Sequence, residues 1–133
     1  MAEAPRSAVD VVTEAAQAVY TALGEGHSEA TYHTAMTVEL QERGVRYWSK
    51  PDIIVTYRDV PVGRLEPDLV IVLEDGLVIE LKAVKQLESA KTQMRAYLRT
   101  MGHQSGLVVN FAGAQPEVLP VLVESDADET PQP

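Results

Sequence analysis

The sequence contains no cysteine, and only 5% of its residues are Phe, Trp or Tyr. The absence of cysteine excludes disulfides, thiolate zinc sites and a cysteine nucleophile. No apolar run approaches the roughly 18 residues that a membrane span needs. The N-terminus also lacks the basic and apolar regions of a secretory signal. We therefore expect a soluble cytoplasmic protein, without a membrane partner, whose core is packed mainly by aliphatic side chains.

Basic residues are also scarce, because 11 Lys and Arg stand against 20 Asp and Glu, for a net charge of -9. This balance argues against a generic nucleic-acid coat protein. Residues 124–133 are acidic and proline-containing, and we expect them to form a disordered tail. Of the 133 residues, 45% are hydrophobic. That content predicts a single domain over residues 1–123.

Apolar periodicity predicts three helices, each of which ends at or near a glycine. The predicted helices are 8–23, from a Ser28 N-cap to near Gly44, and from about Lys85 to Met101 with Gly102 as C-cap. The extended segments are 45–57, with Pro51 as a break or edge, then 62–73, 77–83 and 107–111, with a further edge strand over 117–123. Residues 58–61 are predicted to form a turn. The element order is therefore ααβββαβ(β). A strand-helix-strand passage from Leu77 to Phe111 predicts a parallel pair beside an antiparallel hairpin. We expect an α/β (α+β) fold with a mixed central sheet flanked by helices.

Three ionisable residues interrupt two otherwise apolar strands: Asp68, Glu80 and Lys82. Charges in buried strands are costly unless they are paired or bound to a metal. An Asp and a Glu close together, beside a Lys, suit a divalent cation and a scissile phosphate. The alternative is a buried Glu–Lys ion pair without a ligand.

The strand register decides whether these groups can meet. Asp75 and Gly76 predict a tight hairpin turn. A strict two-residue turn would point Asp68 to the opposite face of the sheet from Glu80. A common site therefore requires a three-residue loop or a β-bulge, and Pro67 is a place for local bending.

Five short segments, in order, carry a resemblance to a known family. They are Gly26-His27-Ser28-Glu29-Ala30-Thr31-Tyr32, Pro67-Asp68, Glu80-Leu81-Lys82, Gln93-Met94-Arg95-Ala96-Tyr97-Leu98 and Gly106-Leu107-Val108-Val109-Asn110-Phe111. With these segments the sequence resembles the PD-(D/E)xK nuclease superfamily and, within it, the small GxxExxY proteins. The resemblance spans roughly Leu23 to Phe111.

The resemblance implies a nuclease that uses Mg²⁺ or Mn²⁺ to hydrolyse DNA or RNA phosphodiester bonds. The implied metal ligands are Asp68, Glu80, the carbonyl of Leu81 and, from the second helix, Glu29. Lys82 would position or activate the attacking water, and Gln93 would bind a water or a phosphate. For Glu29 the alternative is a first-turn carboxylate favoured by the helix dipole. For Gln93 it is an exposed polar residue of the helix.

Two other functions stay open. The resembling proteins commonly carry a basic residue just before the catalytic aspartate, where this chain has Glu66 and Pro67. The added negative charge favours a non-catalytic binding or structural module with the same fold. A metal-dependent hydrolase of small phosphorylated molecules is the weaker alternative. A nuclease of this size would gain nucleic-acid surface as a homodimer or in a larger assembly.

Overall fold

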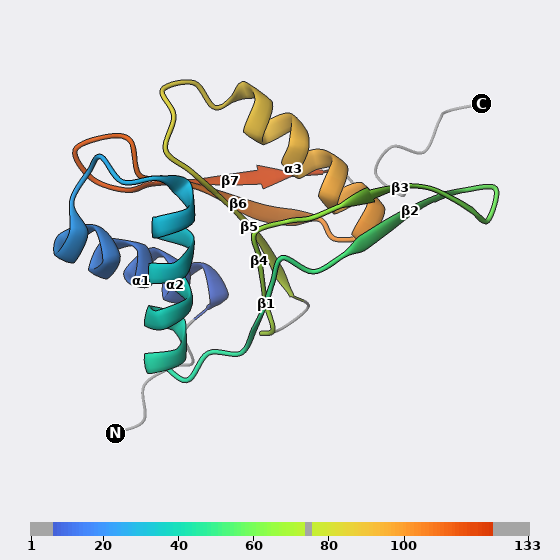
Figure 1. Cartoon of the computed structure of the whole chain (residues 1–133). Coiled ribbons are helices and arrows are strands. Elements are labelled where there is room, and N and C mark those ends of the chain that lie inside the picture. The colour runs from blue at the N-terminus through green and yellow to red at the C-terminus, as the bar shows by residue number, and fades with distance from the viewer. Residues whose placement is uncertain (1–6, 74–75, 124–133) are drawn as a thin grey trace.

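The computed structural model describes residues 7–73 and 76–123. In order, the elements are α1 (Ala8–Leu23), α2 (Glu29–Glu42), β1 (Tyr47–Ser49), β2 (Ile53–Tyr57), β3 (Val60–Leu65), β4 (Leu69–Ile71), β5 (Leu77–Lys82), α3 (Glu88–Met101), β6 (Ser105–Asn110) and β7 (Glu117–Leu122). One sheet has the strand order β1-β4-β5-β6-β7, and β2 pairs only with β3 (Figure 1). β5 and β6 are parallel, and the other pairs are antiparallel. The predicted mixed sheet is confirmed, whereas the expected tail at 124–133 lies outside the described residues.

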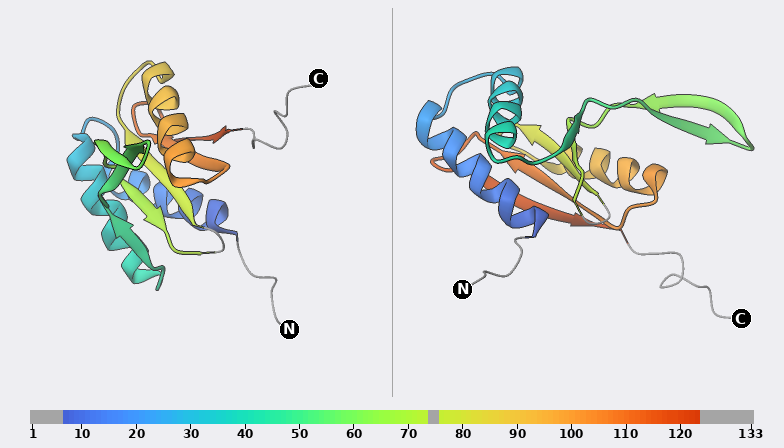
Figure 2. Two further views of the ribbon diagram at one scale, coloured as in Figure 1. Left: turned by 90° about the vertical axis from the view of Figure 1, so that its right-hand side faces the viewer. Right: turned by 90° about the horizontal axis from the view of Figure 1, so that it is seen from below.

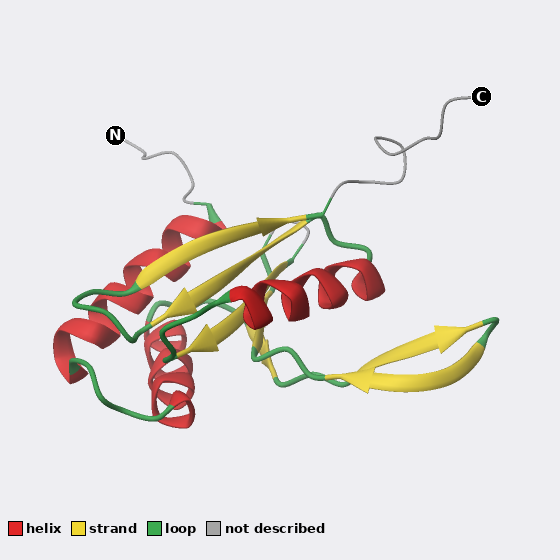
Figure 3. Ribbon diagram, turned by 90° about the horizontal axis from the view of Figure 1, so that it is seen from above, coloured by secondary structure: helices red, strands yellow, loops and turns green. Residues whose placement is uncertain are grey.

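Helices cover both faces of the five-stranded sheet (Figures 2 and 3). On one face, α1 and α2 pack against the alternate strand residues Leu69, Ile79 and Leu107. On the other face, α3 packs against Val70, Val78 and Val108. β5 therefore carries buried apolar residues on both faces, as expected for a central strand covered on both sides. Glu80 and Lys82 share the parity of Val78 and so lie on the α3 face.

Local capping signals placed the helix ends well. The Asp10 N–H donates to Ser7 Oγ at 3.1 Å, and the Thr31 N–H donates to Ser28 Oγ at 3.2 Å. Gly102 ends α3 in the left-handed conformation, with φ 74°. None of the helices in the described part of the chain is both long and apolar enough to cross a membrane.

The helix α3 begins at Glu88, three residues later than predicted. Its N-cap, Leu87, makes no capping hydrogen bond with its side chain. The preceding backbone is held by other elements, since the Ala83 N–H donates to Glu29 and the Val84 N–H donates to Asn110. These long-range contacts fix the backbone just before the predicted start, and residues 85–87 are not helical.

Two long predicted strands are each divided, which gives five strands rather than three before α3. The first breaks at residues 50–52, where Lys50 has φ 49° and Pro51 follows. The second breaks at residues 66–68, around Pro67, which has no N–H for a strand ladder. The inner parts, β2 and β3, leave the main sheet as a separate hairpin. The first break lies at Pro51, where a break or edge was expected, but the continuous strand predicted over 62–73 was wrong because periodicity does not reveal a change of partner.

The β2–β3 hairpin projects from the body of the protein (Figure 3). Its two-residue turn consists of Arg58 and Asp59, both with positive φ, at 51° and 64°. Positive φ at both central residues is the type I′ pattern that matches the twist of a hairpin. The turn was expected here, but Val60 and Pro61 belong to β3 rather than to the turn.

At Gly106 the side chain of Met94 from α3 packs directly against the backbone of β6. A Cβ atom at this position would lie 2.5 Å from Met94 Sδ and 2.9 Å from the Val78 carbonyl oxygen. The sulfur can move, but the carbonyl belongs to the strand paired with Gly106. We expect Gly106→Ala to lower the free energy of unfolding by about 2 kcal/mol, the cost of overpacking a tight core. Urea denaturation in EDTA will measure this.

The matched control for that substitution is Gly63→Ala in β3. A Cβ there meets its nearest heavy atom, Val55 Cβ, at 3.8 Å, which is an ordinary contact. We expect a change within about 0.5 kcal/mol. Equal effects of the two substitutions would contradict the close packing of α3 on β6.

Candidate active site

The register of β4 and β5 places Asp68 opposite Glu80. Ile71 pairs with Leu77 and Leu69 with Ile79, so the next step of the same antiparallel ladder joins position 68 to position 80. Both side chains therefore point to the α3 face. Asp68 and Glu80 therefore share one face of the sheet, as a common site requires, because the connection between β4 and β5 is longer than two residues.

The connection spans residues 72–76, so β4 and β5 are not joined by the strict two-residue turn that would have separated the two side chains. The Gly76 N–H donates to the Leu73 carbonyl at 2.9 Å, and Gly76 has φ 91°. Asp75, the first residue of the predicted turn, lies outside the described residues. A three-residue loop or a bulge was expected, but the longer loop alone supplies the shift in register.

The two carboxylates are held in different ways. Asp68 Oδ2 accepts the Leu81 N–H at 2.7 Å and so extends the strand ladder by one bond. Glu80 is 4% exposed, and its Oε2 lies 3.5 Å from Lys82 Nζ. Its Oε1 is buried and has no hydrogen-bond partner. A buried carboxylate oxygen without a partner is costly and calls for a ligand.

Electrostatics keep Glu80 partly protonated near neutral pH. Burial, and then the charge of Asp68, raise its pKa from 4.5 to about 7. Lys82 and the Asp68 backbone N–H lower it, but they do not compensate. A divalent cation would supply the missing positive charge and favour the ionised form.

Asp68 experiences a milder version of the same effects. Burial raises its pKa, and the Leu81 N–H opposes the rise. The nearby charges of His33, Lys82 and Lys50 also lower it. The charged neighbours that favour its ionised form are thus basic groups from α2, β5 and the β1–β2 connection.

The helix α3 contributes two residues to the border of the site. Tyr97 is buried, and its hydroxyl donates to the Glu66 carbonyl at 3.4 Å. Burial and then the charge of Glu80 raise the pKa of Tyr97, and its interaction with Gln93 lowers it. Gln93 therefore lies beside a hydroxyl that faces the carboxylates. Its sequence-predicted place near the site agrees with this geometry, and its catalytic role stays a prediction.

Glu29 is brought to the end of β5. Its Oε2 accepts the Ala83 N–H at 3.0 Å, immediately after Lys82. Ser28 caps the helix that carries Glu29. Two neighbouring residues therefore hold the start of α2 and the backbone after β5. In the structure Glu29 fixes the backbone just beyond Lys82, and its role as a metal ligand stays a prediction.

Two residues near the site were missed as site residues by sequence reasoning. Asn110 is buried, and its side chain accepts the Val84 N–H at 3.1 Å and donates to the Val84 carbonyl at 2.8 Å. His33 Nε2 lies 3.1 Å from the Asp68 carbonyl oxygen and 3.2 Å from Ser49 Oγ. Asn110 could have been found, because a polar residue at the end of an apolar strand indicates a structural or functional contact. His33 could not, because a single histidine on a helix predicts no particular partner.

The donor set fits a hard divalent cation. Among residues 7–73 and 76–123, no group of three or more His or acidic side chains forms a metal cluster. Asp68, Glu80 and the Leu81 carbonyl would supply three oxygens, and Mg²⁺ usually keeps several waters. The partnerless Glu80 Oε1 provides the structural test, because it offers a lone pair in a place where water is excluded. The residues present therefore fit the metal that the motif implies.

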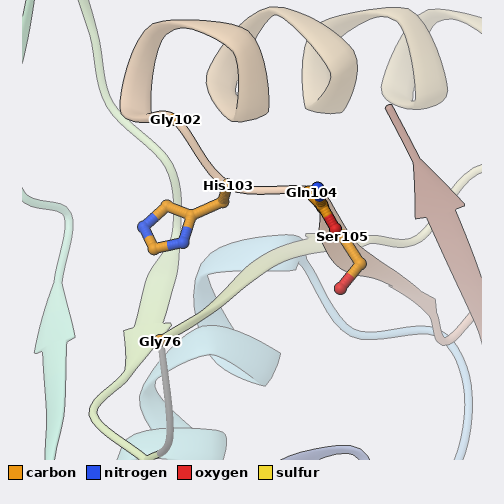
Figure 4. Close-up of a pocket in the computed structure, with 5 residues that line it drawn as sticks. All are labelled: Gly76, Gly102, His103, Gln104 and Ser105. Atoms are coloured by element: carbon orange, nitrogen blue, oxygen red, sulfur yellow. The ribbon is translucent and has the colours of Figure 1, made fainter. Parts of the chain in front are cut away.

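A separate cavity of about 460 Å³ lies near the opposite end of β5. Gly76, Gly102, His103, Gln104 and Ser105 line it, and Figure 4 shows them together. None of these lining residues is a carboxylate, and Gly76 is six residues from Lys82 along the chain. This cavity is thus distinct from the Asp68–Glu80 site.

Comparison with known proteins agrees with the architecture. A family model of the PD-(D/E)XK nuclease superfamily matches residues 6–119. A search of curated proteins returns no match. The chain is similar to the solved structure of SSO0001, with a TM-score of 0.56 and 15% identity, over 75% of this chain and 52% of that one. At this identity the likeness shows the fold alone, and this chain spans about half of that structure's length. Because the family model covers most of the 133 residues, the chain belongs to the PD-(D/E)XK nuclease superfamily.

Proposed function

We propose that the protein is a nuclease that hydrolyses phosphodiester bonds of DNA or RNA with Mg²⁺ or Mn²⁺. The observation that carries this proposal is the buried, partnerless Oε1 of Glu80 opposite Asp68. Superfamily membership supports nuclease-type chemistry. The five segments that resemble the GxxExxY proteins lead us to place the chain in that group.

The proposed roles follow from the positions of the side chains. Asp68 and Glu80 would hold the metal with the Leu81 carbonyl, and Glu29 would help through the backbone it fixes or as a further ligand. When bound, the metal lowers the pKa of a water and stabilises charge on the phosphate. Lys82, 3.5 Å from Glu80, would orient the attacking water or donate to the phosphate oxygens.

Charge near Asp68 favours a phosphate substrate. Lys82, Lys50 and His33 all lower the Asp68 pKa, so positive charge gathers at the site although the chain is acidic overall. Gln93 also lines an open surface cavity of about 610 Å³ on α3. An open surface suits a polymer better than a small phosphorylated molecule, which would need an enclosed pocket.

The second candidate is a binding module without turnover, and Glu66 favours it. This exposed glutamate precedes Pro67 and Asp68, so it adds negative charge where a phosphate would approach. Such a module would retain the fold and its metal site but would not cleave. Either function is compatible with a homodimer, which would enlarge the nucleic-acid surface.

The first test is calorimetric titration of Mn²⁺ and Mg²⁺ into the wild type and Asp68→Asn. We expect wild-type binding and at least about a tenfold loss of affinity in the variant, since even outer-shell partners contribute that much. The substitution keeps one oxygen as an acceptor for the Leu81 N–H and removes the negative charge and the second carboxylate oxygen. No substrate needs to be known for this measurement.

The matched control is Asp59→Asn at the tip of the β2–β3 hairpin. It removes the same charge far from the site, and asparagine tolerates the positive φ of that position. Its metal affinity should equal that of the wild type. A folded wild type that binds neither metal, with or without a short oligonucleotide, would reject the proposed metal site.

A further inference from the structure

The only tryptophan of the sequence, Trp48, lies on the same sheet face as the Asp68–Glu80 pair. It is the central residue of β1 and pairs with Val70 of β4. Val70 has the same parity as Asp68, so Trp48 and Asp68 are diagonal neighbours on one face. Such neighbours have Cα atoms about 7–8 Å apart, within reach of an aromatic ring.

This tryptophan is 63% exposed, although it is the largest side chain on that part of the sheet. β1 is an edge strand, and α3 contacts β5, β6 and β7 of the main sheet (Figure 1). The helix that buries Val70 and Val78 therefore leaves the ring of Trp48 open. A large apolar ring in water beside a polar site is a typical feature of a binding surface.

Two basic residues, Lys50 and His33, contact the backbone of Asp68. The Lys50 N–H donates to the Asp68 carbonyl at 3.0 Å, which continues the β1–β4 ladder and sets Lys50 opposite Asp68. His33 Nε2 reaches the same carbonyl at 3.1 Å. Positions 50, 68 and 80 thus form a row across three strands, with Trp48 two residues away along β1.

We propose that Trp48 is a stacking platform for an unpaired base of single-stranded nucleic acid whose phosphate lies at the Asp68–Glu80 site. The inference rests on the proposed function and narrows its substrate class. A π-face beside a cationic backbone path is how single strands are bound without sequence preference. Bases inside a duplex are stacked on one another, so this platform selects single strands or frayed ends.

The single tryptophan makes the test direct, because all tryptophan fluorescence comes from this position. A short single-stranded oligothymidylate is titrated into the wild type in EDTA, which prevents metal-dependent cleavage. We expect saturable quenching by the single strand and much weaker quenching by a blunt duplex of equal length. Anisotropy of the labelled oligonucleotide gives the affinity independently.

Substitutions separate stacking from charge. Trp48→Ala should weaken single-strand binding about five- to a hundredfold, and Trp48→Phe should retain most of the affinity. The slope of affinity against salt concentration should not change in either variant, because no phosphate contact is lost. Leu122→Ala is the matched control, since Leu122 is 71% exposed on the opposite edge strand. Thermal melting verifies that each variant is folded.

The outcomes distinguish this inference from the nuclease proposal. Wild-type quenching without cleavage in Mn²⁺ or Mg²⁺ would retain the stacking platform and reject the nuclease. Cleavage without quenching, or Trp48→Ala binding as tightly as wild type, would overturn the platform alone. Light scattering that shows a dimer lost in Trp48→Ala, without quenching by the oligonucleotide, would overturn it in favour of a contact between copies of the chain.

Discussion

Replacement of Lys82 by alanine is expected to reduce metal-dependent cleavage by about 10²–10³-fold, the usual effect of removing one donor to a developing charge. The ammonium is 3.5 Å from Glu80 Oε2, and the side chain is 23% exposed. It therefore contacts the buried carboxylate while remaining accessible to a substrate. The measurement is the single-turnover rate on labelled oligonucleotides at saturating Mn²⁺.

Metal binding provides the discriminating second readout. Lys82 donates to the site but cannot ligate a cation, so Lys82→Ala should still bind Mn²⁺ by calorimetry. Lys91→Ala is the matched control, because Lys91 pairs with Glu88 on α3 at 3.8 Å and lies outside the site. Unchanged cleavage by folded Lys82→Ala would remove Lys82 from the chemistry. Loss of metal binding instead would show that Lys82 acts by maintaining the carboxylates.

Local chemistry explains which parts of the fold the sequence predicts well. Ser28 and Gly102 determine helix ends through contacts within a few residues, so their roles are visible in the sequence. Central strand β5 is recognisable from its apolar run. By contrast, the departure of β2 and β3 from the sheet depends on which strand pairs with β1. The strand that pairs with it, β4, and the strand that does not, β3, have similar apolar patterns in the sequence.

In the candidate site, too, features that depend on local sequence are predictable and those that depend on long-range contacts are not. Asp68 and Glu80 stand out because charge interrupts apolar strands, but their sharing of a face depends on the loop over 72–76. A loop one residue longer or shorter would move one side chain to the other face. The contacts of Asn110 and His33 join segments far apart in the chain. Hydrophobic periodicity carries no information about such contacts.

The pH dependence of stability should reveal the free-energy cost of ionising the buried carboxyl groups of Glu80 and Asp68 in the absence of a metal. The folded-state pKa of Glu80 is raised to about 7 by burial, from an ordinary value of 4.5. The folded protein therefore binds the proton more tightly than the unfolded chain, and stability falls as pH rises from about 4.5 to 7. The raised pKa of Asp68 acts in the same direction. We expect a loss of about 2–3 kcal/mol between pH 5 and pH 8 in EDTA.

Glu80→Gln tests this assignment by urea denaturation at the two pH values. The amide cannot ionise, so the variant should lose most of the pH dependence and exceed wild-type stability at pH 8 in EDTA. Glu42→Gln, on the exposed end of α2, should behave as wild type. Mn²⁺ should stabilise the wild type more at pH 8 than at pH 5, because it binds the ionised carboxylates. A wild type that becomes more stable from pH 5 to pH 8 in EDTA would contradict a raised Glu80 pKa. If Glu80→Gln still shows the full loss, the pH dependence comes from another group.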